Sequence, residues 1–196
     1  MNLEHFLVIL SILIAALGTA AYMRDTLAGR SKPNRISWSM WALAPLVSTG
    51  AALSIHADVW ATARIFFAGF FPLLIFAASF LNKQSYWKLT AFDLLCGLCS
   101  ATALIVWALV NSPRAAILLG ALGDGFACFP TIVKAWKHPK TETGSTYIAS
   151  LVSTLLVIPA IPRWDIENSA FEIYLIAANT LLVVAVYRDY FFGKRK

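Results

Sequence analysis

A chain of 196 residues in which 59% are hydrophobic and only 13% are charged cannot cover a water-facing surface, because soluble domains average about 25% charged residues. Its net charge of +6 comes from Lys and Arg in short breaks between apolar runs and not from one basic face, which excludes a typical nucleic-acid-binding domain. The sequence therefore predicts one all-α integral membrane domain over residues 1–196, with the lipid bilayer as a partner and no nucleic acid.

Seven apolar runs bounded by charged residues predict seven transmembrane helices. The first run follows Glu4 and no Lys or Arg, which differs from a cleaved signal peptide and predicts a retained helix. The sixth run is the shortest and ends at Pro159, so we expect it to break there or to extend a turn toward Thr143. The expected spans are 6–23, 36–55, 61–81, 89–110, 115–133, 147–161 and 170–187.

The basic residues alternate between the connections of these spans. One set of connections holds 13 of the 16 Lys and Arg residues, and the other holds only Arg64, Arg114 and Arg163. Cytoplasmic loops carry the excess of Lys and Arg, so we expect an outside N-terminus, a cytoplasmic C-terminus and a location in the plasma (inner) membrane. The basic set is Arg24, Arg30, Lys32, Arg35, Lys83, Lys88, Lys134, Lys137, Lys140, Arg188, Lys194, Arg195 and Lys196.

An internal repeat is indicated by the tetrad Leu-Val-Ser-Thr, which occurs at 46–49 and again at 151–154, in the second and sixth spans. The repeat predicts two parallel three-helix units, 6–81 and 115–187, joined by a linker helix at 89–110 (3+1+3). Parallel repeats of this kind are one transporter plan, with the solute held between the repeats. Ser48 and Ser153 of the two tetrads are therefore candidate substrate-binding residues.

The segment 129–145, FPTIVKAWKHPKTETGS, resembles the PQ-loop signature of the SWEET and semiSWEET (MtN3) superfamily. In that family a Pro-Gln pair near the cytoplasmic end of helices one and five precedes a basic loop and a Gly/Ser start of the next helix. Pro130 stands at the position of the Pro and Thr131 at that of the Gln. The resemblance implies a transporter fold, and it implies that Asn179, near the centre of the seventh span, contacts the solute.

Two carboxylates fall in the predicted spans, where an ionisable group is costly and is a functional candidate by default. Asp124 lies between two glycines near the middle of the fifth span, and we interpret it as a substrate-binding or proton site; a buried Asp paired with a neighbouring hydroxyl is the alternative. Asp93 lies five residues from Lys88 and is either a proton site or a group that reaches the interface. Trp41 is a further candidate, as a flat wall for a solute ring.

Four prolines interrupt predicted spans and are candidate hinges, because each removes a backbone donor and permits a bend. The three cysteines lie in apolar runs, and the C-x-x-C of Cys96 and Cys99 lacks a second ligand pair for zinc, so neither a disulfide nor a metal site nor any cofactor is expected. The hinge candidates are Pro45, Pro72, Pro130 and Pro159.

The sequence thus predicts a transporter of a small polar solute, a sugar or another polar metabolite, that works by alternating access and has no catalytic residue. A second copy of the chain is a further expected partner. One alternative is a receptor or assembly protein on the same fold. A weaker one is an intramembrane aspartyl protease, because Phe92-Asp93 and Gly123-Asp124 resemble that class's motifs and two carboxylates that share a proton could activate water.

Overall fold

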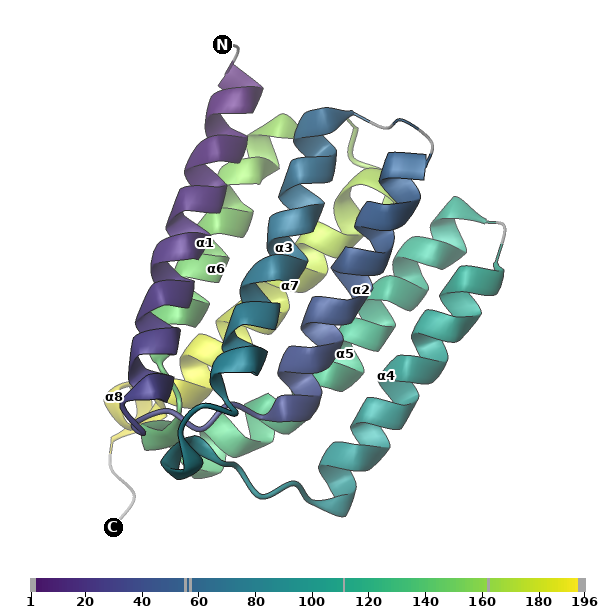
Figure 1. The fold of residues 1–196 in the computed structure, drawn as a ribbon. Helices are drawn as coiled ribbons and strands as arrows, with labels where there is room; N and C mark the ends of the chain where they lie inside the picture. Colours follow the sequence, from purple (N-terminus) through teal and green to yellow (C-terminus); the bar gives the residue numbers. More distant parts are fainter. Residues whose placement is uncertain (1–2, 55, 57, 111, 162, 194–196) are drawn as a thin grey trace.

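The computed structural model describes residues 3–54, 56, 58–110, 112–161 and 163–193, and every regular element in these ranges is helical. The predicted span end at residue 55 and the basic residues 194–196 lie outside them. The helices stand side by side as a bundle (Figure 1). The α-helices are α1 Leu3–Leu27, α2 Arg35–Ser54, α3 Val59–Ala78, α4 Ala91–Leu109, α5 Pro113–Lys137, α6 Gly144–Val157, α7 Ile166–Val186 and α8 Arg188–Phe192. Three short 3₁₀ turns, η1 Lys83–Ser85, η2 Pro139–Thr141 and η3 Ile158–Ala160, lie in the described ranges as well.

Six of these helices, α1 to α5 and α7, are long and apolar enough to cross a bilayer. The shortest of them has 19 residues and the longest 25, or about 28–38 Å at about 1.5 Å per residue, which matches a hydrocarbon core of about 30 Å. Their outward side chains are large and apolar; Leu17, for example, is 72% exposed. The expectation of a membrane-embedded, all-α protein is consistent with these helices.

The helix at the sixth predicted span differs from the other six. α6 begins at Gly144, a turn before the predicted start, and its α-helical part has only 14 residues. It ends at Val157 and continues as η3, because Pro159 lacks the N–H that an α-helix needs and its ring crowds the preceding turn. The predicted break at Pro159 and the extension toward Thr143 are both present.

Local sequence signals fix where the helices begin. The Thr90 side chain and the Asp93 carboxylate form a reciprocal capping box that starts α4. Asp58 caps α3 by accepting from two backbone N–H groups, and Ser112 caps α5. Asn34 accepts from the N–H groups of Ile36 and Ser37 and so starts α2.

The helices pack in a repeated pattern. α3 packs against both α1 and α2, and α7 packs against both α5 and α6. Between these groups, α1 contacts α6 and α2 contacts α5, whereas α4 contacts α5 and α2 and stands at the edge of the bundle (Figure 1). The small residue Gly18 permits the close approach of α1 to α6, since a Cβ added there would lie 2.6 Å from the Ala149 Cβ.

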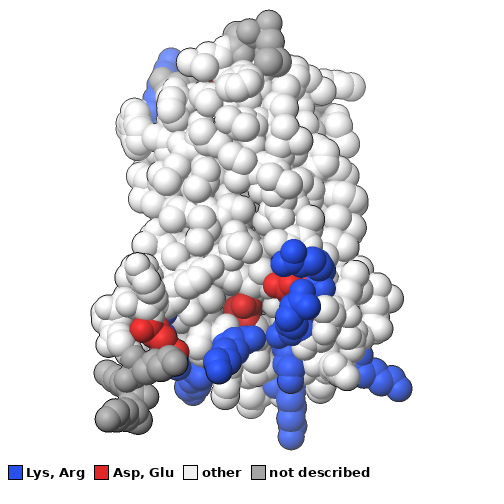
Figure 2. Space-filling model, turned by 90° about the vertical axis from the view of Figure 1, so that its left-hand side faces the viewer, with Lys and Arg blue, Asp and Glu red and all other residues white. Residues whose placement is uncertain are grey.

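The two ends of the bundle differ in charge. The N-terminus lies at one end and the C-terminus at the other (Figure 1). Figure 2 shows the Lys and Arg side chains of one face gathered at the end that holds the C-terminus, with few at the opposite end. We call these the basic end and the outer end.

Candidate functional site: a central cavity

A cavity of about 540 Å³ lies inside the bundle, lined by α1, α2, α3, α5, α6 and α7, with two side chains from α4. It is in the size range of ligand pockets, about 300–1,000 Å³. All five residues that the sequence marked as substrate-binding line this cavity, although they come from four different helices. They are Asp124, Asn179, Trp41, Ser48 and Ser153.

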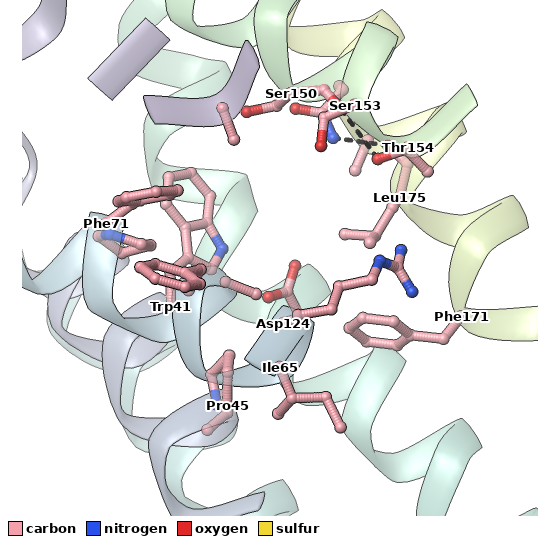
Figure 3. Close-up of a pocket in the computed structure, with 18 of the residues that line it drawn as sticks. Trp41, Pro45, Ile65, Phe71, Asp124, Ser150, Ser153, Thr154, Phe171 and Leu175 are labelled. Carbon is pink, nitrogen blue, oxygen red and sulfur yellow. Dashed lines mark hydrogen bonds between the residues drawn. The ribbon is translucent and has the colours of Figure 1, made fainter. Parts of the chain in front are cut away.

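Asp124 is the cavity's central polar group. The Tyr174 hydroxyl of α7 donates to its Oδ2 over 2.6 Å, and the Trp41 side chain of α2 lies to one side of the same carboxylate (Figure 3). Its two glycine neighbours bring other helices close: Gly123 packs against α4, and Gly125 packs against the Tyr174 ring. Among the described residues, no Lys, Arg or His forms an ion pair with Asp124.

Asp93 occupies a different place. It lies in the first turn of α4, outside the residues that line the cavity, and its oxygens accept from the Asn34 amide over 2.8 Å and from the backbone and hydroxyl of Thr90. Gly123 packs against Ala103 and Ser100, seven to ten residues along α4 from Asp93, or about 10–15 Å. The structure therefore does not bring Asp93 and Asp124 together as a pair that shares a proton.

An aromatic and aliphatic layer closes the cavity toward the basic end. Tyr22, Trp38 and Tyr147 meet there, with ring centroids 4.9 Å apart for Tyr22 and Trp38 and 6.5 Å apart for Tyr22 and Tyr147. Ile75 and Leu182 pack into the same cluster and are almost fully buried. This layer is the floor of the cavity.

A buried polar network lies directly beneath the floor. Glu142 Oε2 accepts from the hydroxyls of Tyr22 and Tyr147 over 2.6 Å and 2.7 Å, and its Oε1 lies 2.5 Å from Lys134 Nζ. The side chains of Lys134 and Glu142 are 1% and 0% exposed, and Lys134 also donates to the Lys32 carbonyl in the other half of the chain. The network therefore ties α1, α5 and α6 together with the loop before α2.

A second set of polar contacts joins further segments at the basic end. The Thr143 hydroxyl donates to Asp25 Oδ2 over 3.0 Å and is 2.6 Å from the Ser31 hydroxyl. Thr131, at the position of the family's Gln, donates to Ser37 Oγ over 2.7 Å and joins α5 to α2. All of these contacts lie at the basic end, between segments more than 90 residues apart.

At the outer end, one ion pair spans the cavity. Arg64 of α3 lies 2.5 Å from Glu172 Oε1 of α7, and both side chains line the cavity. Glu172 Oε2 is buried and has no hydrogen-bond partner. The count of basic residues groups Arg64 with the outer connections, whereas the structure places Arg64 and Glu172 within the second turns of α3 and α7.

The prolines fall into two groups. Pro45 and Pro72 lie inside α2 and α3 and line the cavity, whereas Pro130 lies inside α5 and Pro159 in η3, and neither lines it. Their role as hinges stays a prediction. The three cysteines are free, and no group of metal-ligating side chains occurs in the described ranges.

Sequence reasoning missed the network at the basic end, because it counted Lys134 as one of several solvated loop charges. One signal was present: Glu142 is the only acidic residue between Asp124 and Asp165 and follows three lysines closely. A lone carboxylate in such a loop indicates a pairing partner.

No family model, curated protein or solved structure matches this chain. The resemblance of residues 129–145 to the PQ-loop signature therefore stays an interpretation of the sequence.

Proposed function

We propose that the protein transports a small polar solute across the membrane by alternating access, and that the structure represents its outward-facing state. The observation that carries the proposal is the central cavity, which reaches Asp124 at mid-depth and is closed toward the basic end by the floor and the buried Glu142 network. A cavity between two halves of a bundle, sealed at one end, is what alternating access requires.

The packing supports two three-helix repeats joined by a linker. The first helix of each unit contacts the second helix of the other unit, as α1 does with α6 and α5 with α2. Within each unit, the third helix (α3 or α7) packs against both the first and the second helix. The tetrads agree in detail: Thr49 donates to the Pro45 carbonyl over 2.8 Å, and Thr154 donates to the Ser150 carbonyl over 2.9 Å. We place α4 outside both units, as the linker.

The charge distribution supports the orientation. Of the 13 basic residues that the positive-inside rule assigns to the cytoplasm, the ten within the described residues belong to the loops and helix ends of the basic end. We therefore place this end and the C-terminus in the cytoplasm of a plasma (inner) membrane, with the N-terminus outside. The closed side of the cavity is then the cytoplasmic one.

Reconstitution tests the proposal. Purified protein in proteoliposomes is assayed for counterflow with a panel of radiolabelled hexoses, polyols, amino acids and small amines. We expect flux of at least one class, and we expect Asp124→Asn to reduce it by tenfold or more. Asp58→Asn is the matched control, because Asp58 lies outside the cavity and Asn also caps a helix well. Absence of flux for every class would contradict transport, and unaltered flux in Asp124→Asn would remove Asp124 from the mechanism.

A further inference from the structure

Five of the seven described Ser and Thr hydroxyls that line the cavity offer only acceptors to a solute. A Ser or Thr hydroxyl has one proton to donate and two lone pairs. Five hydroxyls that line the cavity already donate their proton to a backbone carbonyl, so that only lone pairs remain for a solute; Asn179 likewise uses one N–H on the Leu175 carbonyl. The five hydroxyls belong to Ser11, Thr19, Ser48, Thr146 and Thr154.

Of the described charged side chains that line the cavity, one carboxylate has no counter-charge. Arg64 and Glu172 balance one another, and the remaining lining carboxylate is that of Asp124. Its only hydroxyl donor is Tyr174, and no cation is paired with it in the described part of the chain. A carboxylate that lies half-buried among membrane-spanning helices without a counter-charge is costly, so its free energy falls when a cation binds beside it.

Aromatic faces surround this carboxylate. Trp41 and Phe71 lie to one side of Asp124 in Figure 3 and Phe171 to the other, and Phe67 lines the same cavity. The faces of aromatic rings attract organic cations, best when both are removed from water. An inorganic cation bound in a protein instead requires a shell of several oxygen ligands. Aromatic walls around one carboxylate therefore favour an alkylated ammonium over a metal ion.

We propose that the solute class is an organic cation, with an ammonium headgroup beside Asp124 and a small apolar body against Trp41, Phe71 and Phe171. This inference rests on the proposed function for its site, but not on transport itself. A sugar is the less fitting solute, because its hydroxyls require donors as well as acceptors and it would leave the Asp124 carboxylate without a counter-charge. Among the Ser and Thr hydroxyls of the described lining, only those of Ser150 and Ser153 keep a proton to offer.

Binding to the purified full-length protein in detergent tests this proposal without a transport assay. Choline and 3,3-dimethylbutan-1-ol have the same shape and differ in charge. We expect choline to bind at least about tenfold more tightly, as measured by calorimetry and by the rise in unfolding temperature with ligand concentration. Asp124→Asn is expected to abolish this preference, Asp124→Glu to retain it, and Asp58→Asn to leave it unchanged.

A second pair of variants tests the aromatic wall. Trp41→Leu keeps an apolar side chain but removes the ring, and we expect it to weaken choline binding about three- to tenfold while the neutral alcohol is unaffected. Trp164→Leu is the control, since this indole is exposed and lies outside the cavity. These variants also serve if Asp124→Asn fails to fold.

The outcomes separate the two proposals. Equal affinity for choline and its neutral isostere, tighter binding of hexoses, or equal stabilisation by NaCl would overturn the organic-cation proposal and leave transport to be judged by counterflow. Choline binding that depends on Asp124, with no flux of any amine, would uphold the binding class and contradict transport. In that case the protein is a receptor for the same cation.

Discussion

The two ends of the bundle are held together in different ways. At the basic end, Glu142, Lys134 and two tyrosines form a buried network between segments that are distant in the sequence. At the outer end, the Arg64–Glu172 pair bridges α3 and α7, and its arginine side chain is 30% exposed. The difference indicates which end has to be dismantled for the cavity to change sides.

Loss of a buried ion pair also lowers the unfolding free energy more than loss of a solvent-exposed one. Breaking a buried pair by removing one partner leaves an uncompensated charge in a low-dielectric interior, whereas an exposed pair is screened and contributes little. The network at the basic end is therefore expected to dominate stability, and the outer pair is expected to act mainly on access to the cavity.

The largest effect is expected from Lys134→Met, which leaves the Glu142 carboxylate buried without its cation. We expect a loss of about 3–5 kcal/mol of unfolding free energy, seen as a lower unfolding temperature in detergent. The double variant Lys134→Met with Glu142→Gln should recover most of the loss, because the neutral amide still accepts from the tyrosine hydroxyls. A single variant as stable as the wild type would refute a network that holds this end closed.

A smaller effect is expected from adding one methyl group at each end. Gly18→Ala places a Cβ 2.6 Å from Ala149 Cβ and 3.2 Å from Thr146 Cα, which the close α1–α6 packing cannot admit without a shift. We expect a loss of about 1–3 kcal/mol. Gly50→Ala, in the outer part of α2, meets nothing within 4 Å and should be neutral or stabilising by up to about 1 kcal/mol. Equal losses for both variants would show that the two ends are packed equally tightly.

The smallest effect on stability is expected from Glu172→Gln, which leaves only the Arg64 side chain, 30% exposed, without its partner. Because a partly exposed charge is screened by solvent, we expect a loss of no more than about 1 kcal/mol and little change in the unfolding temperature. The reciprocal variant Arg64→Gln should cost more, because it leaves the buried Glu172 carboxylate without its cation. A loss as large as that of Lys134→Met would mean that the outer end is locked as firmly as the basic end.

The sequence predicted the helices well, because a bilayer requires long apolar runs and the flanking charges mark their ends. It predicted Asp124 and Trp41 as solute-binding candidates because both lie within apolar spans, and both line the cavity. It did not predict the Tyr174 hydroxyl on Asp124 or the Lys134–Glu142 pair. Contacts of this kind depend on helix rotation and on loop conformation, and neither is determined by hydropathy or by the positive-inside rule.

The most direct test of the account is the accessibility of the cavity from each side of the membrane. In a chain whose three cysteines are replaced by alanine, Ser153→Cys places one thiol in the cavity wall. A membrane-impermeant maleimide is applied to right-side-out and to inside-out vesicles, with and without the added change Glu142→Gln. Without Glu142→Gln, we predict that the thiol is labelled from the outer side. With Glu142→Gln, we predict increased labelling from the basic side. A thiol that reacts from neither side, or from the basic side alone in both backgrounds, would contradict an outward-facing cavity closed by the network.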